Sequence, residues 1–108
     1  MPFWYFFSVP KLPNEVAHQS ETVDLKQYLV AEGDAVKVGT PIAVIENYWA
    51  KMLLKANGKG TVMKMTLRSG VTVKVGDPIV TISADGEDIP YGKPYALLEI
   101  TELKRKKP

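Results

Sequence analysis

Apolar residues alternate with polar ones over short stretches of this chain, and glycine, proline and asparagine separate the stretches. Alternation with a period of two is typical of strands that bury one face, and no stretch shows the 3.6-residue period of an amphipathic helix. We therefore predict an all-β chain with essentially no helix. The predicted strands cover residues 3–9, 22–30, 42–46, 52–54, 61–67, 79–83 and 95–101.

Two copies of one pattern make up most of the chain. At an offset of 37 residues, eight positions are identical: Gly33, Val36, Lys37, Val38, Gly39, Pro41, Ile42 and Ile45 match Gly70, Val73, Lys74, Val75, Gly76, Pro78, Ile79 and Ile82. A strand pair that cannot bury its apolar face alone is expected to pack on its copy. We predict a small sandwich or flattened barrel with internal quasi-twofold symmetry. The predicted core consists of Val23, Leu25, Val36, Val38, Ile42, Val44, Val62, Val73, Val75, Ile79 and Ile82.

The first predicted strand is apolar on both faces. Five of the ten aromatic residues lie within Phe3–Phe7, where Trp4 and Phe6 point to one face and the other three point to the opposite face. A strand that is buried on one side only does not need a second apolar face. We expect this face to pack on another subunit, or else on a second layer contributed by residues 95–100.

Composition narrows the class of protein. A chain of 108 residues, 45% hydrophobic and 24% charged, suits one small globular domain. The absence of cysteine excludes disulfides and thiolate chemistry, and His18 has no second imidazole with which to bind a metal. The net charge of +2 depends on the basic run at 104–107, which we interpret as a solvated, frayed tail and not as a nucleic-acid patch. No apolar run is long enough to cross a membrane, and we expect a cytoplasmic protein.

Several motifs around the repeat point to a known family. Residues 9–12 read VPKL, residues 30–36 read VAEGDAV and are followed by GTPI at 39–42, residues 45–50 read IENYWA, and residues 60–62 read GTV. With these motifs the chain resembles the biotinyl/lipoyl carrier domain, closest to the lipoyl domain of 2-oxoacid dehydrogenase acyltransferases, over roughly residues 6–83. The resemblance implies an all-β fold of two antiparallel sheets of about four strands each. It also implies that the N-terminal strand takes the place in copy two that residues 51–55 take in copy one.

The departure from this family lies at the tip of the central hairpin, Glu46, Asn47, Tyr48, Trp49 and Ala50. The family pattern E-T-D-K-A carries its cofactor on the lysine between the aspartate and the alanine. Trp49 occupies that position and Tyr48 replaces the aspartate. We therefore predict a degenerate lipoyl-like domain without a cofactor, which acts as a non-catalytic binding or assembly module.

Lys51 is the alternative attachment site. It lies two residues beyond the position of the family's lysine, about 6–7 Å along a strand. Modification there would make the chain a lipoyl or biotin carrier that shuttles acyl or carboxyl groups. We expect no enzyme and no metal site, because acidic residues such as Glu32, Asp34 and Asp77 lie beside glycine turns without a nucleophile–base pair or phosphate loop.

Two interpretations of the aromatic tip stay open. Tyr48 and Trp49 are residue types that anchor protein partners. Alternatively, Trp49 folds back on apolar neighbours or pairs with Phe3–Phe7 of another subunit. We divide the chain into a lipoyl-like domain (1–83), an extension with a possible extra strand (84–103) and a basic tail (104–108).

Overall fold

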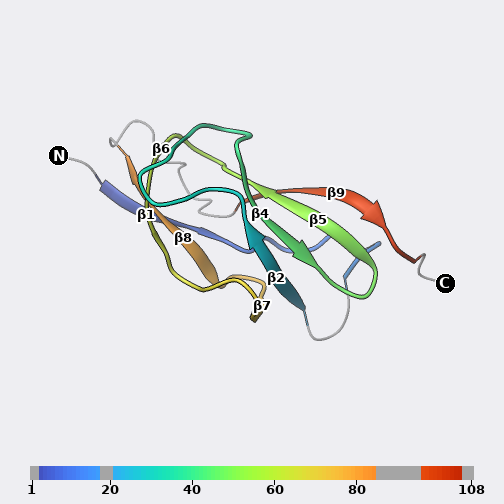
Figure 1. Cartoon of the computed structure of the whole chain (residues 1–108). Coiled ribbons are helices and arrows are strands. Elements are labelled where there is room, and N and C mark those ends of the chain that lie inside the picture. The colour runs from blue at the N-terminus through green and yellow to red at the C-terminus, as the bar shows by residue number, and fades with distance from the viewer. Residues whose placement is uncertain (1–2, 18–20, 85–95, 106–108) are drawn as a thin grey trace.

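The computed structural model describes residues 3–17, 21–84 and 96–105, except the side chain of Phe3. Its regular elements are strands, as predicted, and within the described ranges there is no helix. The strands are β1 (Phe3–Ser8), β2 (Thr22–Tyr28), β3 (Ala35–Val36), β4 (Pro41–Glu46), β5 (Ala50–Lys55), β6 (Gly60–Met65), β7 (Thr72–Lys74), β8 (Pro78–Ala84) and β9 (Leu97–Leu103). They form an antiparallel four-stranded sheet, β1-β8-β6-β3, and an antiparallel five-stranded sheet, β7-β2-β4-β5-β9 (Figure 1).

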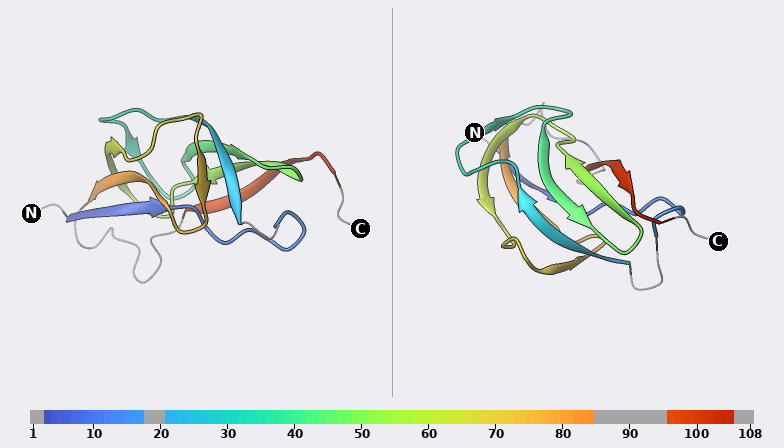
Figure 2. Two further views of the ribbon diagram at one scale, coloured as in Figure 1. Left: turned by 90° about the horizontal axis from the view of Figure 1, so that it is seen from below. Right: turned by 45° about the vertical axis from the view of Figure 1, so that its right-hand side comes forward.

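The two sheets form a sandwich (Figure 2). Their strand pairing has the predicted twofold pattern. β2 pairs with β4 as β6 pairs with β8, and β4 pairs with β5 as β8 pairs with β1. The short strands are exchanged, because β3 pairs with β6 and β7 pairs with β2. The N-terminal strand therefore takes the place in copy two that β5 takes in copy one, as the resemblance implied.

Irregular features repeat with the sequence. The register shift between Leu25 and Gln27 in β2 recurs between Val62 and Lys64 in β6. The turn glycines recur as well: Gly39 and Gly76 both have φ of 92°, in the left-handed region that disfavours side chains. Bulges and turns fix the register of a strand pair. The repeated sequence therefore specifies two copies of one strand arrangement.

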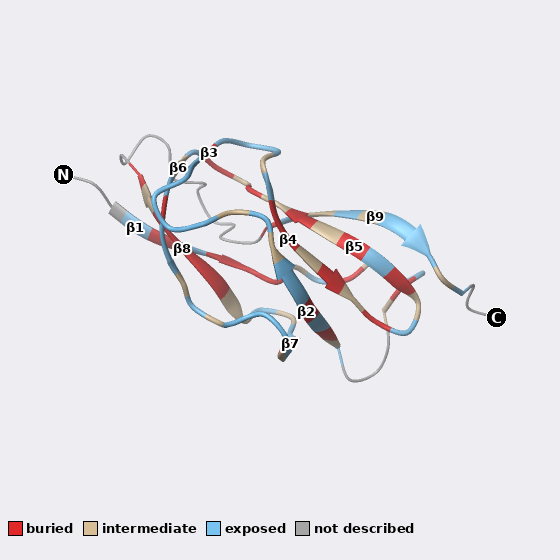
Figure 3. Ribbon diagram, in the orientation of Figure 1, coloured by how far each residue is buried: buried red, intermediate tan, exposed pale blue. Residues whose placement is uncertain are grey.

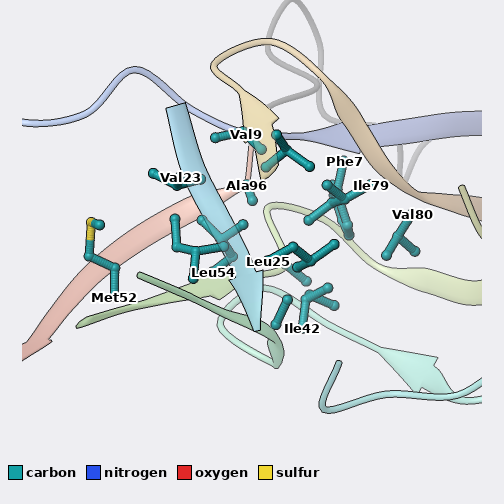
Figure 4. Close-up of a cluster of buried hydrophobic side chains, with 14 of the residues drawn as sticks. Phe7, Val9, Val23, Leu25, Ile42, Met52, Leu54, Ile79, Val80 and Ala96 are labelled. Carbon is teal, nitrogen blue, oxygen red and sulfur yellow. The ribbon is translucent and has the colours of Figure 1, made fainter. Parts of the chain in front are cut away.

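The core lies between the sheets, where alternate residues of the strands are buried (Figure 3). Large side chains from both sheets meet there, among them Phe7, Leu25, Ile42, Leu54 and Ile79 (Figure 4). The prediction is confirmed for eight of the eleven core positions, which are buried: Val23, Leu25, Val36, Ile42, Val62, Val73, Ile79 and Ile82. Val75 is half-buried and packs against this core.

The core prediction is wrong for two residues, Val38 and Val44. Val38 is 63% exposed, because it lies inside the turn in which the amide of Thr40 donates to the carbonyl of Lys37. Val44 is only half-buried. The register shift between Pro41 and Ala43 changes the alternation, so that Ala43 and Ile45 point inward on either side of Val44.

The segments at the two ends of the chain complete the sandwich. The first strand ends at Ser8, one residue before its predicted end. Residues 11–17 form no strand, as predicted, yet Leu12 and Val16 are buried in the core. On β1, Trp4 is 68% and Phe6 is 47% exposed. The extra strand is confirmed as β9, but it extends the five-stranded sheet beyond β5 and does not cover Trp4 and Phe6. The alternative of a second layer from 95–100 is therefore wrong; residue 95 lies outside the described residues.

Tyr28 joins the two sheets through its hydroxyl group. The side chain comes from β2, and its hydroxyl lies within hydrogen-bonding distance of the carbonyls of Leu67 and, at 2.9 Å, of Ile79. Burial raises the pKa of Tyr28, and the hydrogen bond to Leu67 opposes this only in part. The hydroxyl therefore stays a donor to the carbonyl of Ile79 in β8 and to that of Leu67, which follows β6.

Candidate functional site

The hairpin between β4 and β5 ends in a tight turn at Tyr48 and Trp49. Glu46 pairs with Lys51 in the ladder, and the amide of Asn47 donates to the carbonyl of Ala50 at 3.0 Å. Both turn residues have negative φ, since Glu21 is the only non-glycine residue with positive φ in the described part of the chain. The mirror-image hairpin turns, which need positive φ, are thereby excluded.

Asn47 holds this turn in shape. Its side-chain oxygen accepts hydrogen bonds from the amides of Trp49 at 2.9 Å and Ala50 at 3.0 Å. Its side-chain nitrogen donates to the carbonyl of Val16 at 2.7 Å. The side chain is only 7% exposed, so it needs partners for both its donor and its acceptor. An asparagine supplies both, and it fastens the tip to the N-terminal segment.

The two aromatic residues of the turn differ in exposure. Tyr48 is 61% exposed, whereas Trp49 is half-buried and packs against the core. The two rings meet edge to face, with centroids 5.1 Å apart and an interplanar angle of 90°. Trp49 therefore lies partly against the domain's own apolar residues, and Tyr48 offers the larger free surface.

The residues that follow β9 contact the tip. The amides of Lys104 and Arg105 donate to the carbonyl of Trp49 at 2.8 and 3.2 Å. The guanidinium of Arg105 donates to the carbonyl of Tyr48 at 2.6 Å and lies 4.0 Å from the centroid of the Tyr48 ring. The interpretation of 104–107 as a frayed tail is wrong for Lys104 and Arg105, because β9 carries them to the hairpin; 106–108 lie outside the described residues.

Glu46 shares in this contact. The ammonium of Lys104 lies 2.6 Å from the carboxylate of Glu46. The hydrogen bond from Lys104 is the main reason why the pKa of Glu46 is lowered; the positive charges of Lys104, Lys26 and Lys51 act in the same direction. The carboxylate therefore stays ionised and bound to the C-terminal segment at neutral pH.

Lys51 lies in the body of the sheet. It pairs with Glu46 on one side and with Glu102 of β9 on the other. Its ammonium is 3.7 Å from the carboxylate of Glu102, and the two side chains are 48% and 60% exposed. The hydroxyl of Thr101 also donates to the carbonyl of Lys51 at 3.2 Å. Lys51 is thus a flanking strand residue beside the turn.

The acidic residues near the glycine turns have structural partners. Asp34 accepts from the amide of Ala31 at 2.8 Å, and Asp77 accepts from the amide of Lys74 at 2.9 Å. Within the described ranges, no group of three or more residues is arranged to bind a metal ion. His18 lies outside them. The described strands and loops also contain no helix that could cross a membrane.

The sequence alone did not reveal how the tip is held. Neither the clamp made by Asn47 nor the contacts of Lys104 and Arg105 were predicted. An asparagine directly before a two-residue turn could have predicted the clamp, because its side chain often accepts hydrogen bonds from the amides that follow. The alternation of residues 97–103 could have placed a strand directly before the basic pair.

Comparisons with known proteins identify the family of this chain. The biotin/lipoyl family model, described as "Biotin-requiring enzyme", matches residues 11–82. The chain is 43% identical over 70 residues to the dihydrolipoyllysine-residue acetyltransferase component of pyruvate dehydrogenase complex from Rhizobium meliloti (strain 1021). It is 41% identical over 64 residues to the pyruvate dehydrogenase E1 component subunit beta of the same organism. These matches cover 64% and 58% of the chain, but only 16% and 14% of the relatives.

Proposed function

Because the chain belongs to the biotin/lipoyl attachment family, we propose that it is a lipoyl-type domain without an attachment lysine, which serves as a non-catalytic binding or assembly module. The observation that carries this proposal is the composition of the turn. Its two central residues are Tyr48 and Trp49, and neither side chain has an amine that could form an amide with lipoate or biotin.

The surroundings of the turn favour a fixed structure over a mobile arm. Asn47 clamps the backbone, and Trp49 packs partly against the core. A side chain that is held in this way contributes rigid contact area at little entropic cost on binding. We infer that Tyr48, the exposed aromatic of the pair, is the anchor for a protein partner. A cytoplasmic location stays a prediction.

The names of the relatives suggest the kind of partner. Both relatives are named as pyruvate dehydrogenase components. We propose that the domain binds a protein of a 2-oxoacid dehydrogenase-type assembly.

Trp4 and Phe6 supply a second exposed aromatic surface, for which we propose self-association. Sedimentation velocity should show association that weakens in Trp4→Ser/Phe6→Ser; a monomer at high concentration would refute it.

Modification at Lys51 is the alternative function. A carrier needs its amine at the end of a hairpin that a ligase can reach, whereas Lys51 is inside the ladder between Glu46 and Glu102. These contacts favour the proposal that the domain carries no attached lipoyl or biotinyl group. They also predict that Lys51→Arg leaves partner binding unchanged, since both side chains can pair with Glu102.

Restoring the family pattern tests the proposal. The double variant Tyr48→Asp/Trp49→Lys would turn the sequence of the tip into E-N-D-K-A while Asn47 keeps the turn in place. We expect this variant to gain one lipoyl group when a lipoyl ligase is present, as read by intact mass, while the native chain stays unmodified. A folded double variant that remains unmodified would show that the tip differs from the family in more than its acceptor.

A further inference from the structure

The strand β9 is an addition to the twofold pattern. β5 and β1 are equivalent in the two copies, and in the described residues β1 is the last strand of its sheet, whereas β5 carries β9 on its outer edge. The four-stranded sheet is thus complete without a fifth strand. By the same symmetry, the four strands β7-β2-β4-β5 do not need β9 to form their half of the core.

β9 is also weakly buried. Five of its seven residues are exposed, and only Leu98 and Ile100 are partly covered. Its strand pairing is to β5 alone. Segments with few buried apolar contacts open locally at lower free energy than the core. Opening of β9 would therefore leave the sandwich folded.

The contacts at the end of β9 are polar and lie on the functional tip. Lys104 binds the Glu46 carboxylate, and Arg105 binds the carbonyl and covers the ring of Tyr48. Lys51–Glu102 and Lys55–Glu99 add ion pairs along the same strand pair, at 3.7 and 3.3 Å. Partly exposed charge pairs are individually weak and are screened by salt.

We propose that β9 and the basic pair Lys104–Arg105 form a latch that closes on the hairpin tip and controls access to its covered part, one face of the Tyr48 ring and the carbonyl of Trp49. In the closed state, Arg105 covers one face of the Tyr48 ring and two amides occupy the carbonyl of Trp49. Opening frees the covered face of Tyr48 and, beside it, the unpaired backbone edge of β5, a surface suited to an added strand from a partner. That the latch regulates partner binding rests on the proposed function; that it opens locally does not.

Hydrogen exchange on the full-length chain tests local opening. In Lys104→Ala/Arg105→Ala, the amides of 97–105 and the β9-facing amides of β5 should exchange about 10- to 100-fold faster, because one ion pair, one hydrogen bond and one cation–π contact are lost. Amides of β2, β6 and β8 should keep their native rates. The control Lys37→Ala/Lys64→Ala removes the same charge elsewhere and should change none of these rates.

Fluorescence tests access to the tip. The chain has two tryptophans, so Trp4→Phe leaves Trp49 as the only one. In this background, acrylamide should quench Trp49 more strongly once Lys104 and Arg105 are replaced, and more strongly at high salt than at low salt. Unchanged quenching and exchange in the double variant would refute the latch, and so would exchange of β9 at the rate of the core strands. If β9 opens locally but no protein binds the tip, the latch is supported and the proposed function is refuted.

Discussion

Replacing Asn47 by alanine should cost much more stability than its place at a hairpin tip suggests. A turn residue is usually exposed and tolerant of substitution. Asn47 is instead 7% exposed and makes three hydrogen bonds, to the carbonyl of Val16 and the amides of Trp49 and Ala50. Asn47→Ala removes all three and leaves the Val16 carbonyl, in a fully buried residue, without this donor.

The size of the effect follows from these bonds. Each net hydrogen bond contributes about 0.5–1.5 kcal/mol, and a buried group left without a partner costs about 1–3 kcal/mol. Water can replace Asn47 at the part-buried amide of Trp49 more easily than at the buried amide of Ala50 or the buried carbonyl of Val16. We therefore expect Asn47→Ala to lower the free energy of unfolding by about 2–4 kcal/mol, a large share of the 5–15 kcal/mol that is typical of a small domain.

Urea unfolding followed by circular dichroism measures this loss. Gln27→Ala, at an exposed position of β2, is the matched control and should change stability by less than about 0.5 kcal/mol. The hydrogen-exchange rates of Trp49 and Ala50 should rise in Asn47→Ala as well. A loss below about 0.5 kcal/mol would refute the clamp, because it would mean that the three bonds are replaced without cost.

Three further predictions concern the core, a glycine and pH. Ile42→Ala and Ile79→Ala, at equivalent buried positions, should each cost about 2–5 kcal/mol in urea unfolding; a loss under about 0.5 kcal/mol at both would mean that the inward face is misassigned. Gly60→Ala should destabilise by about 1–3 kcal/mol, since an added Cβ would lie 2.5 Å from Ile82 Cγ2 and from the Ser83 carbonyl; no change in thermal midpoint would contradict it. The lowered pKa of Glu46 means that its contribution to stability is present above its ordinary pKa of 4.5 and is lost as pH falls through the folded value. The difference in free energy of unfolding between the native chain and Glu46→Gln should therefore become smaller in acid. A difference that does not change with pH would show that the ion pair with Lys104 does not cause it.

The repeated sequence was enough to predict the arrangement of most strands. Eight identities at one offset placed Gly39 and Gly76 in equivalent turns and put Ile42 and Ile79 in one core. Alternation failed where the backbone is irregular. Val44 follows a register shift, and Val38 lies within a turn, and neither feature changes the apolar pattern of the sequence.

The environment of the tip could not be predicted from neighbouring residues. The side chain of Asn47 donates to the carbonyl of Val16, which is 31 residues earlier in the sequence. Glu46 pairs with Lys104, which is 58 residues later. Local pattern identifies a turn but does not say which distant segment packs on it. A short basic run also has the same composition whether it is solvated or bound, so only the strand pairing of β9 shows where Lys104 and Arg105 lie.

The mass of the native chain tests the central proposal most directly. The chain should be produced together with a lipoyl ligase and a biotin ligase, with lipoate and biotin supplied, beside an ordinary lipoyl domain that shows the ligases are active. We predict that the native chain keeps its unmodified mass while the ordinary domain is fully modified. A native chain that gains one lipoyl or biotinyl group, located by peptide mapping at Lys51, would contradict the proposal and make the domain a carrier.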